Sequence, residues 1–101
     1  MRIEFVRTGG FAGLRMATTI DIDTLPPEEA QELQDALEEA HFFNQPPELL
    51  EESRGVDRFQ YEITVDDGNR QYTIQAGDSS LPEHLQPLVQ KLEWLARTHR
   101  R

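Results

Sequence analysis

The feature that most constrains the fold is a strict alternation of apolar and polar residues between positions 59 and 76. In the first half every second residue is apolar: Phe59, Tyr61, Ile63 and Val65. The alternation resumes at Tyr72, Ile74 and Ala76, after the segment Asp66-Asp67-Gly68-Asn69. Residues with a period of two share one face of a β-strand, and an Asp-Gly pair tolerates two residues at positive φ. The segment therefore predicts a tight β-hairpin with one buried and one solvated face.

Two earlier segments alternate in the same way. The first covers residues 2–7 and the second covers residues 14–22, in which Leu14, Met16, Thr18, Ile20 and Ile22 share one face. Between them lies Thr8-Gly9-Gly10-Phe11-Ala12-Gly13, whose three glycines supply positive φ angles. We expect a second hairpin here, at the start of the chain.

Two stripes of apolar residues, each introduced by proline, predict helices. The first helix is expected over roughly residues 26–40, with its apolar positions at Ala30, Leu33, Leu37 and Ala40. The second is expected from Pro82, with its stripe at Leu85, Leu88, Val89, Leu92, Leu95 and Ala96. Between these helices, residues 41–56 are irregular: Pro46-Pro47 ends any helix, and Leu49-Leu50 is expected to form a short turn on the core.

The order of elements, β-β-α-β-β-α, predicts an α+β fold. We expect a four-stranded, mainly antiparallel sheet with two helices on one face. Residues 1–101 are expected to form a single domain. The chain has no cysteine, so this domain has to be stabilised by its apolar core and not by disulfides.

The charge of the chain is strongly acidic and unevenly distributed. The net charge is −9, and the segment from Met16 to Ser53 contains no Lys or Arg. Its acidic residues are Asp21, Asp23, Glu28, Glu29, Glu32, Asp35, Glu38, Glu39, Glu48, Glu51 and Glu52. We interpret this charge mainly as a solvated surface that keeps the domain a monomer, with steering of a basic partner as the alternative.

The same charge argues against nucleic acid as a partner, because binding to phosphates requires clusters of Lys and Arg. No stretch approaches the ~20 apolar residues that span a bilayer, so no membrane partner is expected. The first residues lack the apolar core of a secretory signal. These observations predict a cytoplasmic protein.

The residues offer little for catalysis. His41, His84 and His99 are far apart in the sequence and none has a second ligand at metal-binding spacing, so we expect no metal and no cofactor. Asp21 and Asp23 lie on one face of a predicted strand, which leaves a paired-carboxylate site as a minor possibility. The sequence therefore predicts a protein that is not an enzyme.

Two aromatic residues are candidates for binding another protein. Phe11 is framed by Gly9, Gly10, Ala12 and Gly13 at the expected hairpin tip. It is expected either to pack on its own domain or to enter a cleft of a partner. Trp94 falls opposite the apolar stripe of the last helix, at 100° per residue. It is expected either to pack under residues 41–56 or to be an exposed contact residue.

The segment Val6-Arg-Thr-Gly-Gly-Phe-Ala-Gly-Leu14 and the segment Asp57-Arg-Phe-Gln-Tyr-Glu-Ile-Thr-Val65, together with the leucine-rich last helix, resemble the emfourin family. Emfourins are small bacterial proteins associated with thermolysin-like zinc metalloproteases, and the family is represented by the inhibitor of protealysin. The resemblance covers essentially the whole chain. It implies inhibition by tight protein–protein binding at or near the active-site cleft of the protease, with no zinc carried by the inhibitor.

With this resemblance, the partner-binding residues are predicted to be Thr8, Gly9, Gly10, Phe11, Ala12, Gly13, Leu14 and Trp94. Thermolysin-like clefts favour bulky apolar side chains, which points to Phe11 or Leu14 as the inserted residue. One alternative is an adaptor that binds a different protein through the hairpin, a sheet edge or Trp94. A second is an enzyme or small-ligand protein that uses Asp21 and Asp23.

Overall fold

A computed structural model of the chain describes residues 1–9, 14–46, 59–77 and 81–98. Its strands and α-helices are β1 (Arg2–Gly9), β2 (Leu14–Asp21), α1 (Pro27–Glu39), β3 (Phe59–Asp66), β4 (Gln71–Gly77) and α2 (Gln86–Thr98). Three short 3₁₀ helices accompany them, namely η1 (Ile22–Thr24), η2 (Phe42–Asn44) and η3 (Glu83–Leu85). The predicted order β-β-α-β-β-α is confirmed.

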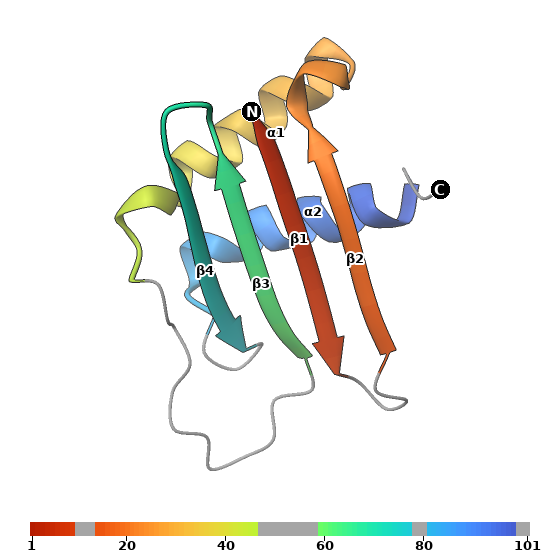
Figure 1. The fold of residues 1–101 in the computed structure, drawn as a ribbon, viewed down its shortest axis with the longest axis vertical. Helices are drawn as coiled ribbons and strands as arrows, with labels where there is room; N and C mark the ends of the chain where they lie inside the picture. The colour runs from red at the N-terminus through yellow and green to blue at the C-terminus, as the bar shows by residue number, and fades with distance from the viewer. Residues whose placement is uncertain (10–13, 47–58, 78–80, 99–101) are drawn as a thin grey trace.

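The four strands form one antiparallel sheet in the order β2-β1-β3-β4. Strand β1 is central: its residue Phe5 pairs with Thr18 of β2 on one side and with Ile63 of β3 on the other. Both α-helices lie behind the same face of the sheet (Figure 1). The predicted α+β class is therefore confirmed, and the opposite face of the sheet has no described helix over it.

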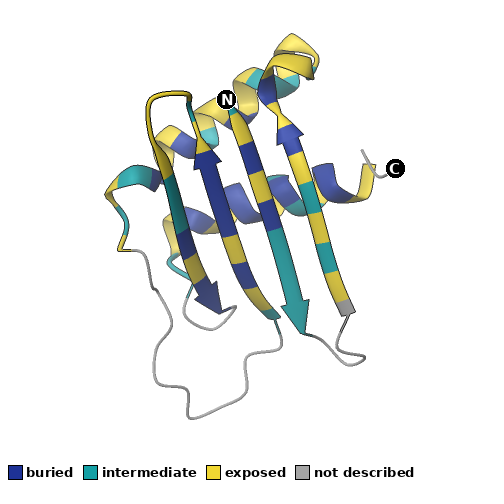
Figure 2. Ribbon diagram, in the orientation of Figure 1, coloured by how far each residue is buried: buried dark blue, intermediate teal, exposed yellow. Residues whose placement is uncertain are grey.

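The core lies between the sheet and the helices. Its largest fully buried side chains come from both layers: Phe5, Phe42, Ile3, Leu33, Ile63, Ile74, Leu85, Leu88, Leu92, Leu95 and Val65. The alternation is visible as bands of buried and exposed residues along the strands (Figure 2). On the helix-free face Thr64 is also buried, and its hydroxyl lies 2.8 Å from that of Thr73 on β4.

The predicted strand over residues 14–22 ends one residue early. The Asp21 carboxylate accepts a hydrogen bond of 3.0 Å from the Asp23 backbone N–H, which begins η1. Ile22 is nonetheless buried, and its N–H donates to the Met1 carbonyl. The first strand, expected over residues 2–7, continues to Gly9.

The last helix begins at Gln86, and not at Pro82 as the sequence suggested. Pro87 has no N–H, so it cannot make the α-helical bond to the Glu83 carbonyl. The Gln86 N–H bonds to that carbonyl instead, in a 3₁₀ turn. Pro82 is therefore the N-cap of η3, and α2 follows it.

The predicted tight turn between β3 and β4 is confirmed: the Asp67 N–H donates to the Arg70 carbonyl at 3.1 Å, and of the two residues between them Gly68, but not Asn69, has a positive φ. Asp66 pairs with Gln71, which leaves a connection of residues 67–70, and Gly68 has a φ of +94°. The Asp67 carboxylate accepts the backbone N–H groups of Asn69 and Arg70, at 2.9 and 2.8 Å. These hydrogen bonds to the side chain, together with the backbone bond between Asp67 and Arg70, hold the turn closed.

The chain after α1 turns back onto the core at Phe42, a buried aromatic residue that the sequence analysis did not single out. His41 precedes it in the left-handed region, with φ +49°. The Tyr72 hydroxyl of β4 donates a hydrogen bond to the Gln45 carbonyl, so this segment lies along the β4 side of the sheet. The predicted turn at Leu49-Leu50 lies outside the described residues.

Candidate protein-binding surface

The predicted hairpin leaves the sheet at the end where β1 and β4 finish and β2 and β3 begin. Gly9, the last residue of β1, pairs with Leu14 at the start of β2 and with Phe59 at the start of β3. Gly77, the last residue of β4, pairs with Gln60. The loop connection of the first hairpin and the chain entering β3 therefore join the same end of the sheet, the lower end in Figure 1.

Four of the predicted binding residues, Gly10, Phe11, Ala12 and Gly13, lie outside the described residues. Thr8 and Gly9 are at the end of β1, and Leu14 begins β2. Gly9 has a φ of +104°, in a region that residues with a Cβ rarely adopt. At this position the predicted need for glycine is confirmed, because the chain leaves the strand through a conformation that requires it.

The base of the hairpin is tied to α2 by Arg7. The alternation of β1 puts Ile3, Phe5 and Arg7 on the helix-covered face. The guanidinium of Arg7 lies 4.6 Å from the ring centroid of Phe59 and forms an ion pair with the carboxylate of Glu93 on α2. The side chains of Arg7 and Glu93 are only 22% and 19% exposed. Two residues before Gly9, the strand is therefore fixed to both a neighbouring strand and a helix.

The group of Arg7, Phe59 and Glu93 was not among the residues predicted from the sequence. A signal for it was present, because Arg7 is a charged residue at an inward position of an alternating strand. Such a residue requires a partner, since a buried charge is unfavourable without one. The acidic partner on the distant last helix could not be identified from the sequence, because the position of that helix over β1 is a property of the fold.

A shallow hollow adjoins the hairpin on the helix-free face of the sheet. It has a volume of about 190 Å³, and its lining includes Val6, Thr8, Gln60, Glu62 and Gln75. The Gln75 side chain donates a hydrogen bond of 3.2 Å to the Glu62 carboxylate. This surface offers the apolar side chain of Val6 and the amide groups of Gln60 and Gln75 close to Thr8, a combination suited to contact with another protein.

Trp94 lies in the other layer of the molecule. It is 41% exposed, and among the residues that the structure describes no other large apolar residue is exposed. The Lys91 ammonium group lies 4.7 Å from its ring centroid and also forms an ion pair of 2.6 Å with Glu32 on α1.

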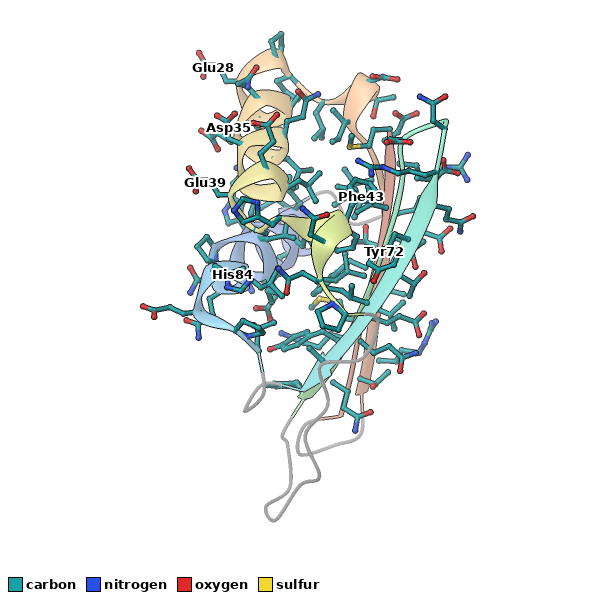
Figure 3. The ribbon with its side chains drawn as sticks, turned by 90° about the vertical axis from the view of Figure 1, so that its left-hand side faces the viewer. Glu28, Asp35, Glu39, Phe43, Tyr72 and His84 are labelled. Atoms are coloured by element: carbon teal, nitrogen blue, oxygen red, sulfur yellow. The ribbon has the colours of Figure 1, made fainter. Side chains whose placement is uncertain are left out.

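The acidic residues of α1 form a charged surface on the outer side of the helix layer. Glu28, Asp35 and Glu39 point away from the sheet along one side of the helix (Figure 3). The last turn of α1 carries no basic residue that would compensate the negative end of the helix dipole. The result is an acidic surface on the side opposite to the helix-free face.

A second hollow, of about 450 Å³, lies between the end of α1, η2 and the β3–β4 turn. Its lining includes Phe43, and the Arg70 guanidinium lies 3.6 Å from that ring centroid. Figure 3 shows Phe43 beside Tyr72, between η2 and the sheet. In the adjoining turn, the backbone N–H groups of Asn69 and Arg70 lower the pKa of the Asp67 carboxyl.

Of the described histidines, His84 contacts the segment that follows η2. His84 Nε2 lies 2.8 Å from the side-chain amide nitrogen of Gln45, which also donates to the Ala40 carbonyl at 3.0 Å. In residues 1–9, 14–46, 59–77 and 81–98 there is no group of three or more His, Cys, Asp or Glu side chains suited to a metal ion. Across the same ranges no helix has the length and apolar character needed to cross a bilayer.

Comparison with known proteins identifies a family. A model of the family named Emfourin matches residues 5–93, which include β2, β3 and β4 and most of β1 and α2. The chain belongs to the emfourin family. No curated protein and no solved structure gives a match. Membership of this emfourin family of inhibitors implies a role related to protease inhibition.

Proposed function

We propose that this emfourin inhibits a thermolysin-like zinc metalloprotease by placing the hairpin of residues 8–14 at or near the active-site cleft. The observation that carries the proposal is the family match over residues 5–93. The ion pair between Arg7 and Glu93 supports the choice of this hairpin, because it holds β1 against α2 immediately before residue 8. The zinc ion in this mechanism belongs to the protease.

The inserted group in this proposal is Phe11. Its neighbours are glycines and an alanine, so the backbone on either side is narrow enough to enter a cleft beside the ring. Full burial of a Phe side chain contributes roughly 1.5–3 kcal/mol to binding. Residues 8–14 contain no Cys or His, so the hairpin blocks the cleft sterically or brings a backbone carbonyl near the zinc. The inhibitor itself performs no catalytic step.

The base of the hairpin supports this role energetically. Binding loops lose affinity when they must be ordered on association, and a loop held in place beforehand avoids part of that cost. Arg7 fixes β1 against Phe59 and Glu93 immediately before the hairpin. The acidic surface of α1 faces away from the helix-free side, so we expect it to affect solubility and association rate more than the contact itself.

The test is a titration of a thermolysin-like protease with the purified protein, followed by cleavage of a peptide substrate. We expect stoichiometric and tight loss of activity for the native sequence. Phe11→Ala is expected to raise the inhibition constant about tenfold to a hundredfold, from the burial energy above, and Phe11→Asp is expected to abolish inhibition. Full inhibition by both variants would remove the hairpin from the mechanism.

The other hairpin supplies the matched control. Asn69 lies in the β3–β4 turn, at the opposite end of the sheet, and is exposed. Asn69→Ala changes a loop residue of a hairpin without touching residues 8–14, so its inhibition constant is expected to stay at the native value. Far-ultraviolet circular dichroism establishes that each variant is folded before its inhibition is measured.

A second function, an adaptor that binds a different protein, is favoured by one observation, the exposure of Trp94. In that case Trp94→Ala removes binding to the partner while Phe11→Ala leaves it intact. The inhibitor proposal expects the reverse order of effects. The cytoplasmic location predicted from the sequence belongs to the same proposal, and fractionation of cells that produce the protein tests it.

A further inference from the structure

The outer edge of β2 is open and self-complementary. Strand β2 lies at one edge of the sheet, and no described segment pairs with its outer side. Edge strands of natural proteins are usually protected by central charges, prolines or bulges. The middle of β2, Met16-Ala17-Thr18-Thr19-Ile20, has none of these charged or proline residues. Its two charged residues, Arg15 and Asp21, are instead near the two ends of the strand.

We propose that β2 pairs with β2 of a second copy of this chain, about a two-fold axis through Thr18. In that antiparallel register Arg15 lies opposite Asp21 of the other copy, and Asp21 lies opposite its Arg15. Both side chains are exposed and both belong to the helix-free face. The axis therefore creates two identical ion pairs, which flank a centre of uncharged residues.

The backbone permits this register. In an antiparallel strand, alternate residues direct their N–H and C=O groups to the same neighbour. Residues paired by the axis, such as Arg15 with Asp21 or Ala17 with Thr19, are an even number of positions apart. Outward-directed groups on one copy therefore meet outward-directed groups on the other, and the two four-stranded sheets become one continuous sheet.

The burial of β2 supports a missing neighbour on this side. Met16 and Thr18 face the helix-covered side, yet they are only half-buried, whereas Phe5, the residue paired with Thr18 on β1, is fully buried. In the proposed register Met16 lies opposite Ile20 of the second copy, an apolar pair. Figure 2 shows the difference, because the intermediate residues of β2 lie at the free edge of the sheet.

The other edge of the sheet lacks these features. Strand β4 contains no charged residue that could form a reciprocal pair. It is also flanked by the segment that contains Gln45, whose carbonyl accepts the Tyr72 hydroxyl. Charge complementarity therefore selects β2 as the interface and a second copy as its partner.

This pairing departs from the monomer expected from the net charge, and it has a consequence for binding. The two-fold axis puts the two glycine hairpins at opposite ends of the joined sheet. Each copy then presents its own hairpin, and one dimer binds two partner molecules. The interface does not depend on the proposed inhibition, because its formation is measured without a protease.

The first test is sedimentation of the native protein up to roughly 1 mM, since a small edge-to-edge contact predicts a weak dimer. The substitution Arg15→Glu puts a negative charge opposite Asp21 of the other copy. It is expected to raise the dissociation constant roughly tenfold to thirtyfold, because two pairs change from attraction to repulsion. The double variant Arg15→Asp with Asp21→Arg restores opposite charges but removes the Asp21 cap of η1, so circular dichroism first checks that it is folded; it is then expected to restore the dimer. Arg70→Glu, the same change in charge in the β3–β4 turn, is expected to leave the dimer intact.

Cysteine cross-linking supplies a second test, because the native chain has no cysteine. Thr18→Cys puts two thiols opposite each other on the axis, within the spacing of a disulfide. It is expected to form a covalent dimer on mild oxidation, whereas Thr19→Cys, which lies opposite Ala17, is not. A protein that stays monomeric at all concentrations, or a dimer unaffected by Arg15→Glu, overturns the proposal. If the protein stays monomeric and Arg15→Glu weakens its inhibition of a protease, the β2 edge contacts the protease and not a second copy.

Discussion

Substitution of Arg7 and Glu93 tests how strongly their ion pair holds the base of the first hairpin against α2. Removal of one partner from an exposed pair costs about 0.2–1 kcal/mol, and removal from a fully buried pair costs about 3–5 kcal/mol. These two side chains are 22% and 19% exposed, which puts the pair between the two limits. Glu93→Gln keeps the shape and a hydrogen-bond acceptor, so we expect it to lower the free energy of unfolding by roughly 1–2 kcal/mol.

Arg7→Met is expected to cost somewhat more, because it also removes the contact between the guanidinium and the Phe59 ring, 4.6 Å away. Contacts of this kind contribute about 0.5–1 kcal/mol at partly exposed sites. The double variant separates the ion pair from these other effects. We expect a coupling of roughly 1 kcal/mol between the two positions, as is usual for residues in direct contact.

The assay is urea unfolding at neutral pH, followed by far-ultraviolet circular dichroism, for the native protein, the two single variants and the double variant. Glu32→Gln is the matched control. Its partner is Lys91, but Glu32 is 64% exposed, so the expected loss is at most about 0.5 kcal/mol. Strictly additive effects of Arg7→Met and Glu93→Gln, with a coupling below about 0.3 kcal/mol, would show that the ion pair does not hold β1 against α2.

Three further predictions concern other parts of the fold. Leu92→Ala removes a fully buried side chain of α2 and is expected to lower the free energy of unfolding by about 2–5 kcal/mol, as measured by urea unfolding. Trp94→Ala is expected to cost only about 1 kcal/mol, since it loses the Lys91 contact on an exposed surface, and to change the inhibition constant less than twofold; a large change would put Trp94 in the interface. The backbone hydrogen bonds that lower the pKa of Asp67 stabilise the fold above the ordinary pKa of the carboxyl, and this contribution is lost as the pH falls through the lower folded-state pKa. Asp67→Ala is therefore expected to destabilise the protein at pH 7 more than at pH 2, and an equal effect at both pH values would contradict this.

The sequence predicted the architecture because each element carried a local signal. Alternation identified the strands, and spacings of three and four identified the helices. The predictions were wrong at the ends of elements, because side-chain hydrogen bonds and proline determine where a strand or helix begins and ends. The carboxylate of Asp21 ended β2 one residue early, and the missing N–H of Pro87 delayed the start of α2.

The candidate site was predictable only in part, for a physical reason. The glycines around Phe11 are contiguous in the sequence, so a hairpin with a narrow backbone could be expected. The group of Arg7, Phe59 and Glu93 joins residues from two strands and a helix that lie far apart in the chain. Only the packing of α2 across β1 brings them together, and no local pattern reports that packing.

The most direct test of the central claim is a nuclear magnetic resonance titration of the ¹⁵N-labelled protein with a thermolysin-like protease. The account predicts that amide signals of residues 8–15 broaden or shift first, while those of Gly68 and Asn69, at the other end of the sheet, follow only the increase in size. An active-site ligand of the protease should reverse the change. Perturbation centred on the β3–β4 turn or on α1, or no perturbation with an inhibited protease, would contradict the claim that the glycine hairpin occupies the cleft.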